Sequence, residues 1–246
     1  MRTFVVSDAH GCPELILNAL GHGRFELGQD AFVYAGDLLD RGPDAQGCIA
    51  LVERYATEIL LGNHDAAALF GFPVLPQNAE SRGLRPYLRQ KVLDGGWKLA
   101  TAVEGVLVTH AGVSQDYGDL FQHECGSDPA RLAACLNARF EALVVREPPL
   151  RDWYDDPLLG DFGPLWFRPA PYTHLAPLPG CAQIAGHTLP LSRMEGTHFY
   201  MIDPTSFDCF DEPGRYRYAL IENGVVRVED GCLGEPAGAP PVRPEC

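Results

Sequence analysis

The chain has 246 residues, of which 46% are hydrophobic, and a formal net charge of −14 from 19 basic and 33 acidic side chains. This length and hydrophobic content are sufficient for one large α/β domain with a full core. A chain this acidic is a poor partner for nucleic acid or for an anionic membrane, because both bind clustered Lys and Arg. We therefore exclude nucleic acid and membrane surfaces as partners.

No leader and no membrane segment are expected. The first residues, MRTFVVSDAHG, lack the long apolar core and the small-residue cleavage site of a signal peptide. No run of about 18 apolar residues is present to form a transmembrane helix. The 8 Cys are scattered without a CxxC pair, which indicates reduced thiols. We expect a cytoplasmic protein, and the sequence does not indicate its oligomeric state.

The N-terminal part of the chain alternates strands and helices. Strands are predicted at residues 3–7, 31–35 and 58–61, and helices begin at Pro13 and Pro43. This order predicts a parallel sheet with right-handed crossovers. Open α/β sheets bind ligands beyond the carboxyl ends of their strands, so the polar loops that follow these strands should meet at one place.

The elements predicted further along are strands and one long helix. A strand pair occupies residues 98–103 and 105–109, and Asp128 is placed to cap a helix over Pro129–Val145. An Asn-Gly hairpin signal joins the last two of the remaining strands. These strands are expected at residues 181–185, 199–203, 216–222 and 225–229.

Two irregular segments interrupt the predicted domain, which spans residues 1–230. Residues 72–97 contain prolines and a basic, helix-like stretch from Ser81 to Val92, and residues 148–180 are rich in Pro and aromatic side chains. Long irregular segments in compact domains are usually functional, so we expect both to lie as insertions over the site. Residues 231–246 lack apolar periodicity and are predicted to form an irregular tail.

Five polar loops, each after a predicted strand, carry side chains that bind metals. Their imidazole, amide and carboxylate groups suit Mn, Fe or Zn rather than a thiolate site. A single Asp-x-His loop is more often a helix cap than a ligand pair, but the ordered set is a strong signal. The loops are Asp8-Ala9-His10-Gly11, Gly36-Asp37-Leu38-Leu39-Asp40-Arg41-Gly42, Gly62-Asn63-His64-Asp65, Val108-Thr109-His110-Ala111-Gly112 and Gly186-His187-Thr188.

In this order the motifs resemble those of the calcineurin-like metallophosphoesterases. Within that superfamily they resemble the serine/threonine phosphoprotein phosphatase (PPP) family, whose pattern runs GDxHG, GDxxDRG, GNHE, HAG and GH. The resemblance covers roughly residues 2 to 205. It implies an α/β fold of two mixed β-sheets packed face to face with flanking helices, a four-layer αββα sandwich.

The resemblance also implies two divalent metal ions, with Mn²⁺ favoured and Fe, Zn, Ni or Mg as alternatives. Two cations about 3.5–4 Å apart polarise phosphoryl oxygens and lower the pKa of a shared water toward about 7, so that this water can attack phosphorus in line. A carboxylate suits the bridging position because it has two oxygens. By the resemblance, Asp8, His10 and His187 would hold one metal, Asn63 and His110 would hold the second, and Asp37 would bridge them.

The same resemblance assigns catalytic and substrate-binding side chains. His64 resembles the general acid of the family, and Asp40 would hold its imidazolium in place. Arg41 offers a fork of donors that matches phosphate oxygens, and Asn63 is expected to bind substrate as well as metal. Arg168 belongs to a Trp-Phe-Arg stretch that resembles the later W-x-R segment of the family, and it would be a second phosphate clamp. A structural role for Arg168, stacked on the neighbouring Trp, is the alternative.

Departures from the family pattern bear on the substrate. The third loop ends in Asp65, one methylene shorter than the Glu of GNHE, and GNHD is similar to bacterial phosphatases and to symmetrical diadenosine tetraphosphate hydrolases. Those hydrolases usually read ARG where this chain has Asp40-Arg41-Gly42. The retained Asp40 favours the phosphatases.

Three hypotheses remain open. The first is a phosphatase for phosphate monoesters, with protein phosphoserine or phosphothreonine as substrate. The second is a hydrolase of dinucleoside polyphosphates, so that the partner is a phosphorylated metabolite or nucleotide. It is favoured by the basic side chains of the 72–97 segment, Arg82, Arg85, Arg89 and Lys91. The third is a non-catalytic metal-binding scaffold, which the complete motif set disfavours.

Overall fold

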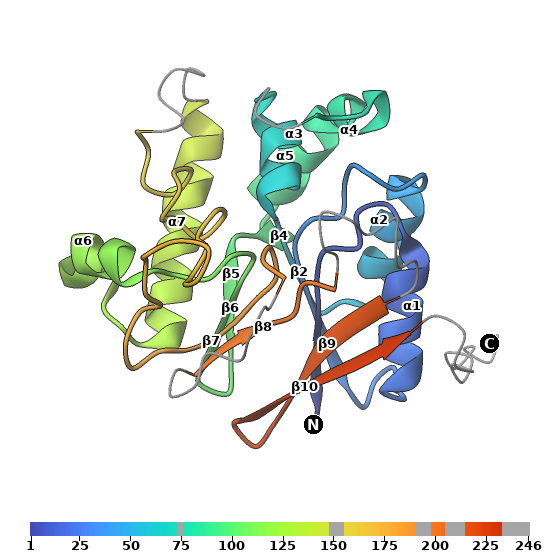
Figure 1. Cartoon of the computed structure of the whole chain (residues 1–246). Helices are drawn as coiled ribbons and strands as arrows, with labels where there is room; N and C mark the ends of the chain where they lie inside the picture. Colours follow the sequence, from blue (N-terminus) through green and yellow to red (C-terminus); the bar gives the residue numbers. More distant parts are fainter. Residues whose placement is uncertain (73–75, 148–154, 190–197, 205–214, 233–246) are drawn as a thin grey trace.

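The structure is a computed structural model that describes residues 1–72, 76–147, 155–189, 198–204 and 215–232 (Figure 1). The first part of the predicted 148–180 segment and most of the predicted tail lie outside the described residues. The helices are α1 (Pro13–His22), α2 (Ala45–Tyr55), α3 (Asn63–Phe70), α4 (Ala79–Gly83), α5 (Arg85–Leu93), α6 (Gln115–Cys125) and α7 (Pro129–Arg146). The strands are β1 (Thr3–Val6), β2 (Ala31–Ala35), β3 (Glu58–Leu60), β4 (Trp97–Lys98), β5 (Ala100–Val103), β6 (Val106–Thr109), β7 (Ala182–Ala185), β8 (Phe199–Met201), β9 (Arg215–Glu222) and β10 (Val225–Cys232).

The strands form two mixed sheets. The first has the order β10-β9-β1-β2-β3-β4, in which β1 to β4 are parallel and the β9–β10 hairpin is antiparallel. The second has the order β5-β6-β7-β8, in which β6, β7 and β8 are parallel. The parallel arrangement predicted for the first three strands is confirmed. In both sheets the polar loops follow the carboxyl ends of parallel strands.

Alternating side chains pack the two sheets together. Val5 and Val33 of the first sheet lie in one buried cluster with Val108 and Ile184 of the second. The neighbouring strand residue Phe4 belongs instead to the cluster that includes the helices, because successive strand side chains point to opposite faces. Figure 1 shows α1 and α2 beside the first sheet and α7 beside the second. The predicted four-layer α/β sandwich is confirmed.

One predicted strand is divided between the two sheets. The strand expected at residues 98–103 is β4 in the first sheet and β5 in the second, with Leu99 between them. The side chain of Asn137, on α7, holds this crossing, because its Oδ1 accepts from the N–H groups of Leu99 and Ala100, each at 2.9 Å. The predicted helix-like stretch from Ser81 to Val92 is likewise divided into α4 and α5, with a Pro in the first turn of α5.

Two helices have no counterpart in the sequence prediction. Helix α3 is buried from Asn63 to Leu69, so it has no solvent-exposed face to produce helical periodicity, and the sequence predicts a loop over its first residues. Helix α6 contains Gly118 in its interior, which lowers helix propensity.

A disulfide links Cys125, the last residue of α6, to Cys135 in the interior of α7. The expectation that the thiols are reduced is therefore wrong for this pair, and the cytoplasmic location stays a prediction. Strand β10 extends to Cys232, two residues into the segment predicted as an irregular tail. None of the helices in the described part of the chain has the length and apolar character needed to span a membrane.

Candidate metal centre

The five polar loops converge where the two sheets meet. Asp8 and Asp37 follow β1 and β2, Asn63 begins α3 after β3, and two histidines follow β6 and β7 of the second sheet. All the side chains predicted as ligands are buried: Asp8, His10, Asp37, Asn63, His110 and His187. Both sheets therefore contribute to one polar site inside the protein.

The backbone at the site is unusually strained. Asp8, His10, Asp37 and His187 have φ angles of 53°, 44°, 61° and 62°, in the left-handed region that residues other than glycine seldom adopt. Such conformations persist only where the surrounding structure enforces them, and they cluster at functional sites. The same conformation recurs at the predicted catalytic residues Asp40 and Arg41, with φ angles of 68° and 63°.

Hydrogen bonds hold the first two loops together beyond the end of the sheet. The N–H groups of Asp8 and His10 donate to the carbonyls of Gly36 and Asp37, at 2.9 and 3.0 Å. The buried hydroxyl of Tyr34 accepts from the N–H of Ala9 at 2.9 Å and donates to the carbonyl of Asp37 at 3.1 Å. This hydroxyl thus links the two strained loops.

A fully buried carboxylate fixes the loop that carries Asp37. Asp65 accepts from the backbone N–H groups of Asp37 at 2.8 Å, Leu38 at 3.1 Å, Leu39 at 3.2 Å and Gly62 at 2.9 Å. Burial and the nearby Asp37 carboxylate raise the pKa of Asp65 to about 7, while the backbone N–H groups oppose that rise. Asp65 was noted in the sequence only as a shortened Glu, and its structural role was missed.

Asp37 lies between histidines of different loops. Its Oδ2 is 3.4 Å from Nε2 of His10 and 3.5 Å from Nε2 of His110, and its Oδ1 accepts from the N–H of His64 at 2.9 Å. Burial acts to raise the pKa of Asp37, but the surrounding imidazoles, His110 first, outweigh it and hold the pKa below its usual value. An ionised carboxylate in this position is suited to contact two cations.

The imidazoles present lone pairs to the interior of the site. Nδ1 of His10 lies 2.8 Å from the carbonyl of Leu39, and Nδ1 of His110 lies 3.0 Å from that of Ala35. Each Nδ1 is therefore the protonated donor, which leaves the Nε2 atom of each ring as an acceptor. Burial lowers the pKa of His10 to about 3 and lowers that of His110, so both rings are in the neutral form that binds metals.

One of these acceptors faces another acceptor, since Nε2 of His110 is 2.9 Å from Oδ1 of Asn63. The same oxygen lies 3.1 Å from Nδ1 of His187, which can donate to it and so leave Nε2 of that ring as an acceptor. Nε2 of His10 and Nε2 of His187 are buried and have no hydrogen-bond partner among the described residues. A cation would satisfy all these lone pairs, so the residues present fit divalent metal ions.

Asp37 belongs to two possible ligand groups. Ligand atoms of Asp8, Asp37 and His110 lie within 4.8 Å of one another, and so do those of His10, Asp37 and His64. The carboxylate of Asp37 is common to both groups. The second group includes His64, which the sequence assigned to proton transfer rather than to a metal.

His64 and Asp40 form a buried pair at the edge of this cluster. Nδ1 of His64 is 2.7 Å from Oδ2 of Asp40, whose side chain is 1% exposed. Burial acts to raise the pKa of Asp40, but hydrogen bonds, that of His64 first, and the charge of His64 together outweigh it and hold the pKa below its usual value. Two residues of the 72–97 segment support the pair, since the side chain of Gln77 donates to the carbonyl of His64 and the N–H of Asn78 donates to Asp40, each at 3.3 Å.

The two candidate phosphate clamps differ in their surroundings. Arg41 is exposed, and its charge is near enough to His10 to contribute to the lowered pKa of that ring. Arg168 is half-buried, and its Nη1 donates to the carbonyl of His187 at 3.2 Å and to the hydroxyl of Thr188 at 3.4 Å. Arg168 therefore lies against the His187 loop, while the ring of Trp166 packs edge-on to His187.

Asp203 is a buried site residue that was not predicted. It follows β8 and is 4% exposed, and its charge, after burial, is the main cause that raises the pKa of Asp8. The signal was present in the sequence, because Asp203 ends the predicted strand at residues 199–203 just as the other polar residues follow their strands.

Residues 1–189 match the family described as calcineurin-like phosphoesterase. The chain belongs to this family. The resemblance drawn from the five motifs is thereby confirmed.

This phosphoesterase is similar to enzymes of two substrate classes. It is 44% identical over 68 residues to serine/threonine-protein phosphatase 1 of Salmonella typhimurium, which is 28% of this chain and 32% of that protein. It is 26% identical over 138 residues to the symmetrical bis(5'-nucleosyl)-tetraphosphatase of an Enterobacter species, which is 52% of this chain and 49% of that protein. The chain thus spans a third to a half of the length of these curated relatives.

Solved structures share the fold of this phosphoesterase. A cold-active protein-tyrosine phosphatase of a psychrophilic Shewanella species has a TM-score of 0.64 at 17% identity, covering 94% of this chain and 80% of that one. A putative diadenosine tetraphosphatase has a TM-score of 0.56 at 20% identity, covering 95% of both chains. At these identities the likeness establishes the sandwich fold alone.

Asp65→Asn tests the carboxylate that holds the Asp37 loop. The NH₂ group of the Asn side chain cannot accept the hydrogen bonds that the backbone N–H groups donate to Asp65. We therefore expect the affinity for Mn²⁺ to fall by about 10–100-fold, as for other groups that orient metal ligands. Isothermal titration calorimetry on the metal-free protein measures this. Asp94→Asn, the same change at an exposed carboxylate, is the matched control. Equal affinities in the two variants would contradict the role of Asp65.

Proposed function

We propose that this phosphoesterase is a dinuclear metal-dependent phosphatase that hydrolyses phosphate monoesters, with phosphoserine and phosphothreonine of proteins as its substrates. The observation that carries the proposal is the buried contact of 2.7 Å between Asp40 and His64. This contact supports the assignment of His64, with Asp40 behind it, as a proton donor beside the proposed metal ligands. An alkoxide leaving group, as in a phosphate monoester of serine, gains most from such a donor.

The metal site in this proposal uses the buried polar side chains of both sheets. Two bound divalent ions, Mn²⁺ in the favoured case, would polarise the phosphoryl oxygens and lower the pKa of a shared water. Asp37 would contact both ions, in keeping with its place between His10 and His110. The remaining positions would be filled by Asp8, His10 and His187 on one side and by Asn63 and His110 on the other.

The other side chains handle the proton and the substrate. Asp40 orients His64 through Nδ1, so that Nε2 is the nitrogen that donates a proton to the leaving oxygen. Arg41 and Arg168 supply guanidinium groups to the phosphoryl oxygens, and Asn63 contributes its amide. Arg168 is held for this by its hydrogen bonds to the His187 loop.

Hydrolysis of dinucleoside polyphosphates is the second candidate, and the similarity to symmetrical bis(5'-nucleosyl)-tetraphosphatases favours it. Three of the basic side chains of the 72–97 segment, which favour this candidate in the sequence, form ion pairs with acidic residues. Arg85 and Arg89 pair with Glu147 at 3.8 and 2.8 Å, and Lys91 pairs with Glu53. These partners reduce the positive charge that the 72–97 segment offers to a polyphosphate. A non-catalytic scaffold remains the third candidate.

A comparison of substrates tests the proposal. Turnover of p-nitrophenyl phosphate, a phosphoserine peptide and diadenosine tetraphosphate is measured with added Mn²⁺. We expect the monoester and the phosphopeptide to be hydrolysed faster than diadenosine tetraphosphate. Preference for diadenosine tetraphosphate would establish the second candidate, and loss of all three activities in a metal-loaded protein would establish the scaffold.

Asp37→Asn tests the bridging carboxylate. The amide removes the negative charge that two cations would share, so we expect both metal positions to be weakened or empty. Elemental analysis of the purified variant measures the metal content per chain. Asp30→Asn, at a carboxylate that pairs with Arg2 far from these loops, serves as the control. Full metal content in the Asp37 variant would refute the bridging assignment.

His64→Asn separates proton transfer from metal binding. If His64 is the general acid, kcat for a phosphopeptide falls by about 10²–10⁴ while both metals stay bound. If His64 is instead a ligand with His10 and Asp37, the variant loses metal as well as activity. Turnover and elemental analysis on the same preparation distinguish these results, and unchanged turnover would remove His64 from both roles.

A further inference from the structure

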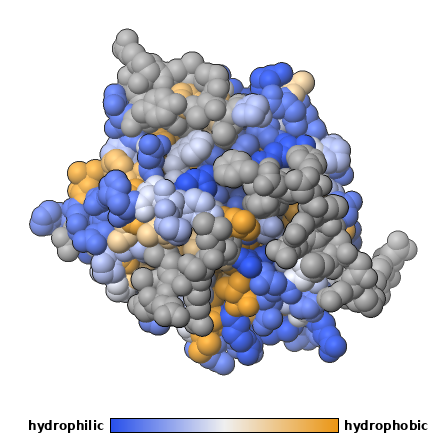
Figure 2. Space-filling model, in the orientation of Figure 1, coloured by the Kyte–Doolittle hydropathy of each residue, from blue (hydrophilic) through white to orange (hydrophobic). Residues whose placement is uncertain are grey.

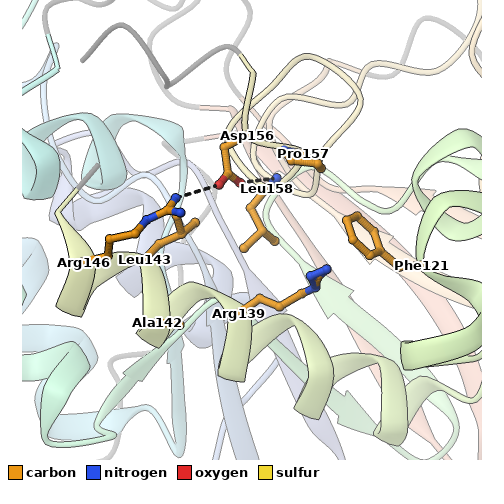
Figure 3. A pocket seen from close by; sticks show the side chains of 8 residues that line it. All are labelled: Phe121, Arg139, Ala142, Leu143, Arg146, Asp156, Pro157 and Leu158. Atoms are coloured by element: carbon orange, nitrogen blue, oxygen red, sulfur yellow. Dashed lines mark hydrogen bonds and ion pairs between the residues drawn. The ribbon is translucent and has the colours of Figure 1, made fainter. Parts of the chain in front are cut away.

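Hydrophilic residues predominate on the face of the molecule that Figure 2 shows, and they separate its apolar areas. A cavity of about 400 Å³ lies between α6, α7 and residues 156–158, outside the metal-binding loops (Figure 3). Its two guanidinium groups have acidic partners, since Arg139 lies 3.3 Å from Glu124 and Arg146 lies 3.4 Å from Asp156. Neither feature distinguishes one phosphate ester from another, whereas a proton donor does, because only poor leaving groups need the proton.

A short stretch of chain, residues 77–82, lies against the pair formed by Asp40 and His64, and we call it the supporting turn. The side chain of Gln77 donates to the carbonyl of His64, and the N–H of Asn78 donates to Oδ1 of Asp40, each at 3.3 Å. The other oxygen of this carboxylate, Oδ2, is 2.7 Å from Nδ1 of His64. The supporting turn therefore contacts the carboxylate oxygen that His64 leaves available.

Ser81 is a fully buried member of the supporting turn. Its N–H donates to Oδ1 of Asn78 at 2.7 Å, so its position is fixed relative to the N–H that reaches Asp40. Its hydroxyl is buried and makes no hydrogen bond of standard geometry among the described residues. Burial raises the pKa of Asp40, and this hydroxyl is close enough to act with His64 in lowering it. Buried hydroxyls are nearly always hydrogen-bonded, so Asp40 is the acceptor within reach of Ser81.

Contacts inside the supporting turn hold it in shape. The N–H of Arg82 donates to the carbonyl of Asn78 at 3.3 Å, and Nη1 of Arg82 donates to the carbonyl of Gln77 at 2.5 Å. Arg82 is one of the basic side chains that favour a polyphosphate in the sequence, and this contact engages its guanidinium within the turn. The turn thus presents Asn78 and Ser81 to the carboxylate as a preformed pair of donors.

Asp40 depends on such support because its backbone is strained. Its φ angle of 68° lies in the left-handed region, which a residue other than glycine keeps only where surrounding contacts enforce it. Beyond the carboxylate, the ring of His64 packs edge-on to that of His10, with the ring centres 4.7 Å apart. Asp40 therefore links the supporting turn to an imidazole that lies beside the proposed metal ligands.

We propose that the supporting turn is a specificity element, in which Asn78 and Ser81 fix the Asp40 carboxylate so that His64 is aligned for poor leaving groups such as the alkoxide of serine. The inference rests on the proposed function, in which His64 donates a proton to the leaving oxygen. An alkoxide is too basic to leave without that proton, whereas p-nitrophenolate and a nucleotide leave without it. A catalytic group misplaced by about 1 Å loses up to about 100-fold in rate. Ser81, which acts through Asp40, is thus a positioning residue.

Kinetics with leaving groups of different basicity test this role. Ser81→Ala removes the hydroxyl, and Ser81→Cys replaces it with a weak donor of similar size. For both variants we expect kcat to fall about tenfold for phenyl phosphate and for a phosphoserine peptide, which is part of the 10²–10⁴ that a proton donor contributes. KM, metal content and turnover of p-nitrophenyl phosphate should stay unchanged. Ser114→Ala is the matched control, because Ser114 is a buried serine whose hydroxyl donates to the carbonyl of Phe162 at 2.9 Å. It should leave the ratio of phenyl to p-nitrophenyl phosphate turnover unchanged.

Combination with His64→Asn separates positioning from a general structural role. Once the proton donor is absent, the hydroxyl of Ser81 has nothing left to align. The double variant should therefore hydrolyse phenyl phosphate as fast as His64→Asn alone. A further tenfold loss in the double variant, or an equal loss on all three substrates in Ser81→Ala, would overturn the proposal. Full activity of Ser81→Cys would also overturn it, because volume rather than hydrogen bonding would then be what matters.

A measurement without catalysis keeps this proposal apart from the proposed function. In the protein loaded with diamagnetic Zn²⁺, the proton between Nδ1 of His64 and Asp40 should give a downfield NMR signal, assigned by its absence from His64→Asn. We expect exchange with water to broaden this signal in Ser81→Ala but not in Ser114→Ala. An equally sharp signal in Ser81→Ala, or no such signal in the parent protein, overturns the positioning role even if phosphopeptides are hydrolysed.

The substrates of the parent protein complete the separation. If it hydrolyses phenyl phosphate but no phosphopeptide, the protein substrate in the proposed function is wrong. The positioning role of Ser81 is then still decided by the NMR signal and by the ratio of the two phenyl esters. If the parent protein hydrolyses no monoester at all, both proposals are wrong.

Discussion

The hydrogen bonds of one buried carboxylate hold together the first-sheet loops of the candidate metal site. Asp65 collects N–H groups from the turn that carries Asp37 and from Gly62 at the start of α3. Asp65 is fully buried, so water cannot take its place as the acceptor for these N–H groups. The interaction holds the start of α3, with Asn63 and His64, next to Asp37, and it satisfies buried N–H groups of both the turn after β2 and the N-terminus of α3. The ligands of the first sheet thus depend on a residue that contacts neither metal nor phosphate in the proposed mechanism.

The site also depends on the contact between the sheets. Asp8, Asp37 and Asn63 come from loops of the first sheet, whereas His110 and His187 come from the second. The apolar layer between the sheets sets the distance across which Asn63 faces both histidines. Because this layer is close-packed, the acceptor atoms of Asn63 and His110 are held near one another, where they repel. A bound cation would remove this repulsion.

Much of this arrangement could be predicted, because polar residues after successive parallel strands must meet at one edge. The sandwich fold and the family followed from those loops, while the roles of the site residues stay predictions. Helix α3 could not be predicted, since it is buried on all sides and lacks periodicity. The roles of Tyr34 and Asp65 were equally hidden, because both act on backbone groups whose positions only the tertiary structure supplies. The Cys125–Cys135 bond needed the packing of α6 on α7, which the spacing of the cysteines does not reveal.

The pairing of β1 has a consequence for biosynthesis. This strand lies between β2, which follows it closely in the chain, and β9, which begins at Arg215. A ribosome must therefore release nearly the whole polypeptide before the central strand gains its second neighbour. Until then the loop with Asp8 and His10 has support from one side only. His187, the last of the proposed ligands, also lies late in the sequence, so the proposed metal site can be complete only after most of the chain has been synthesised.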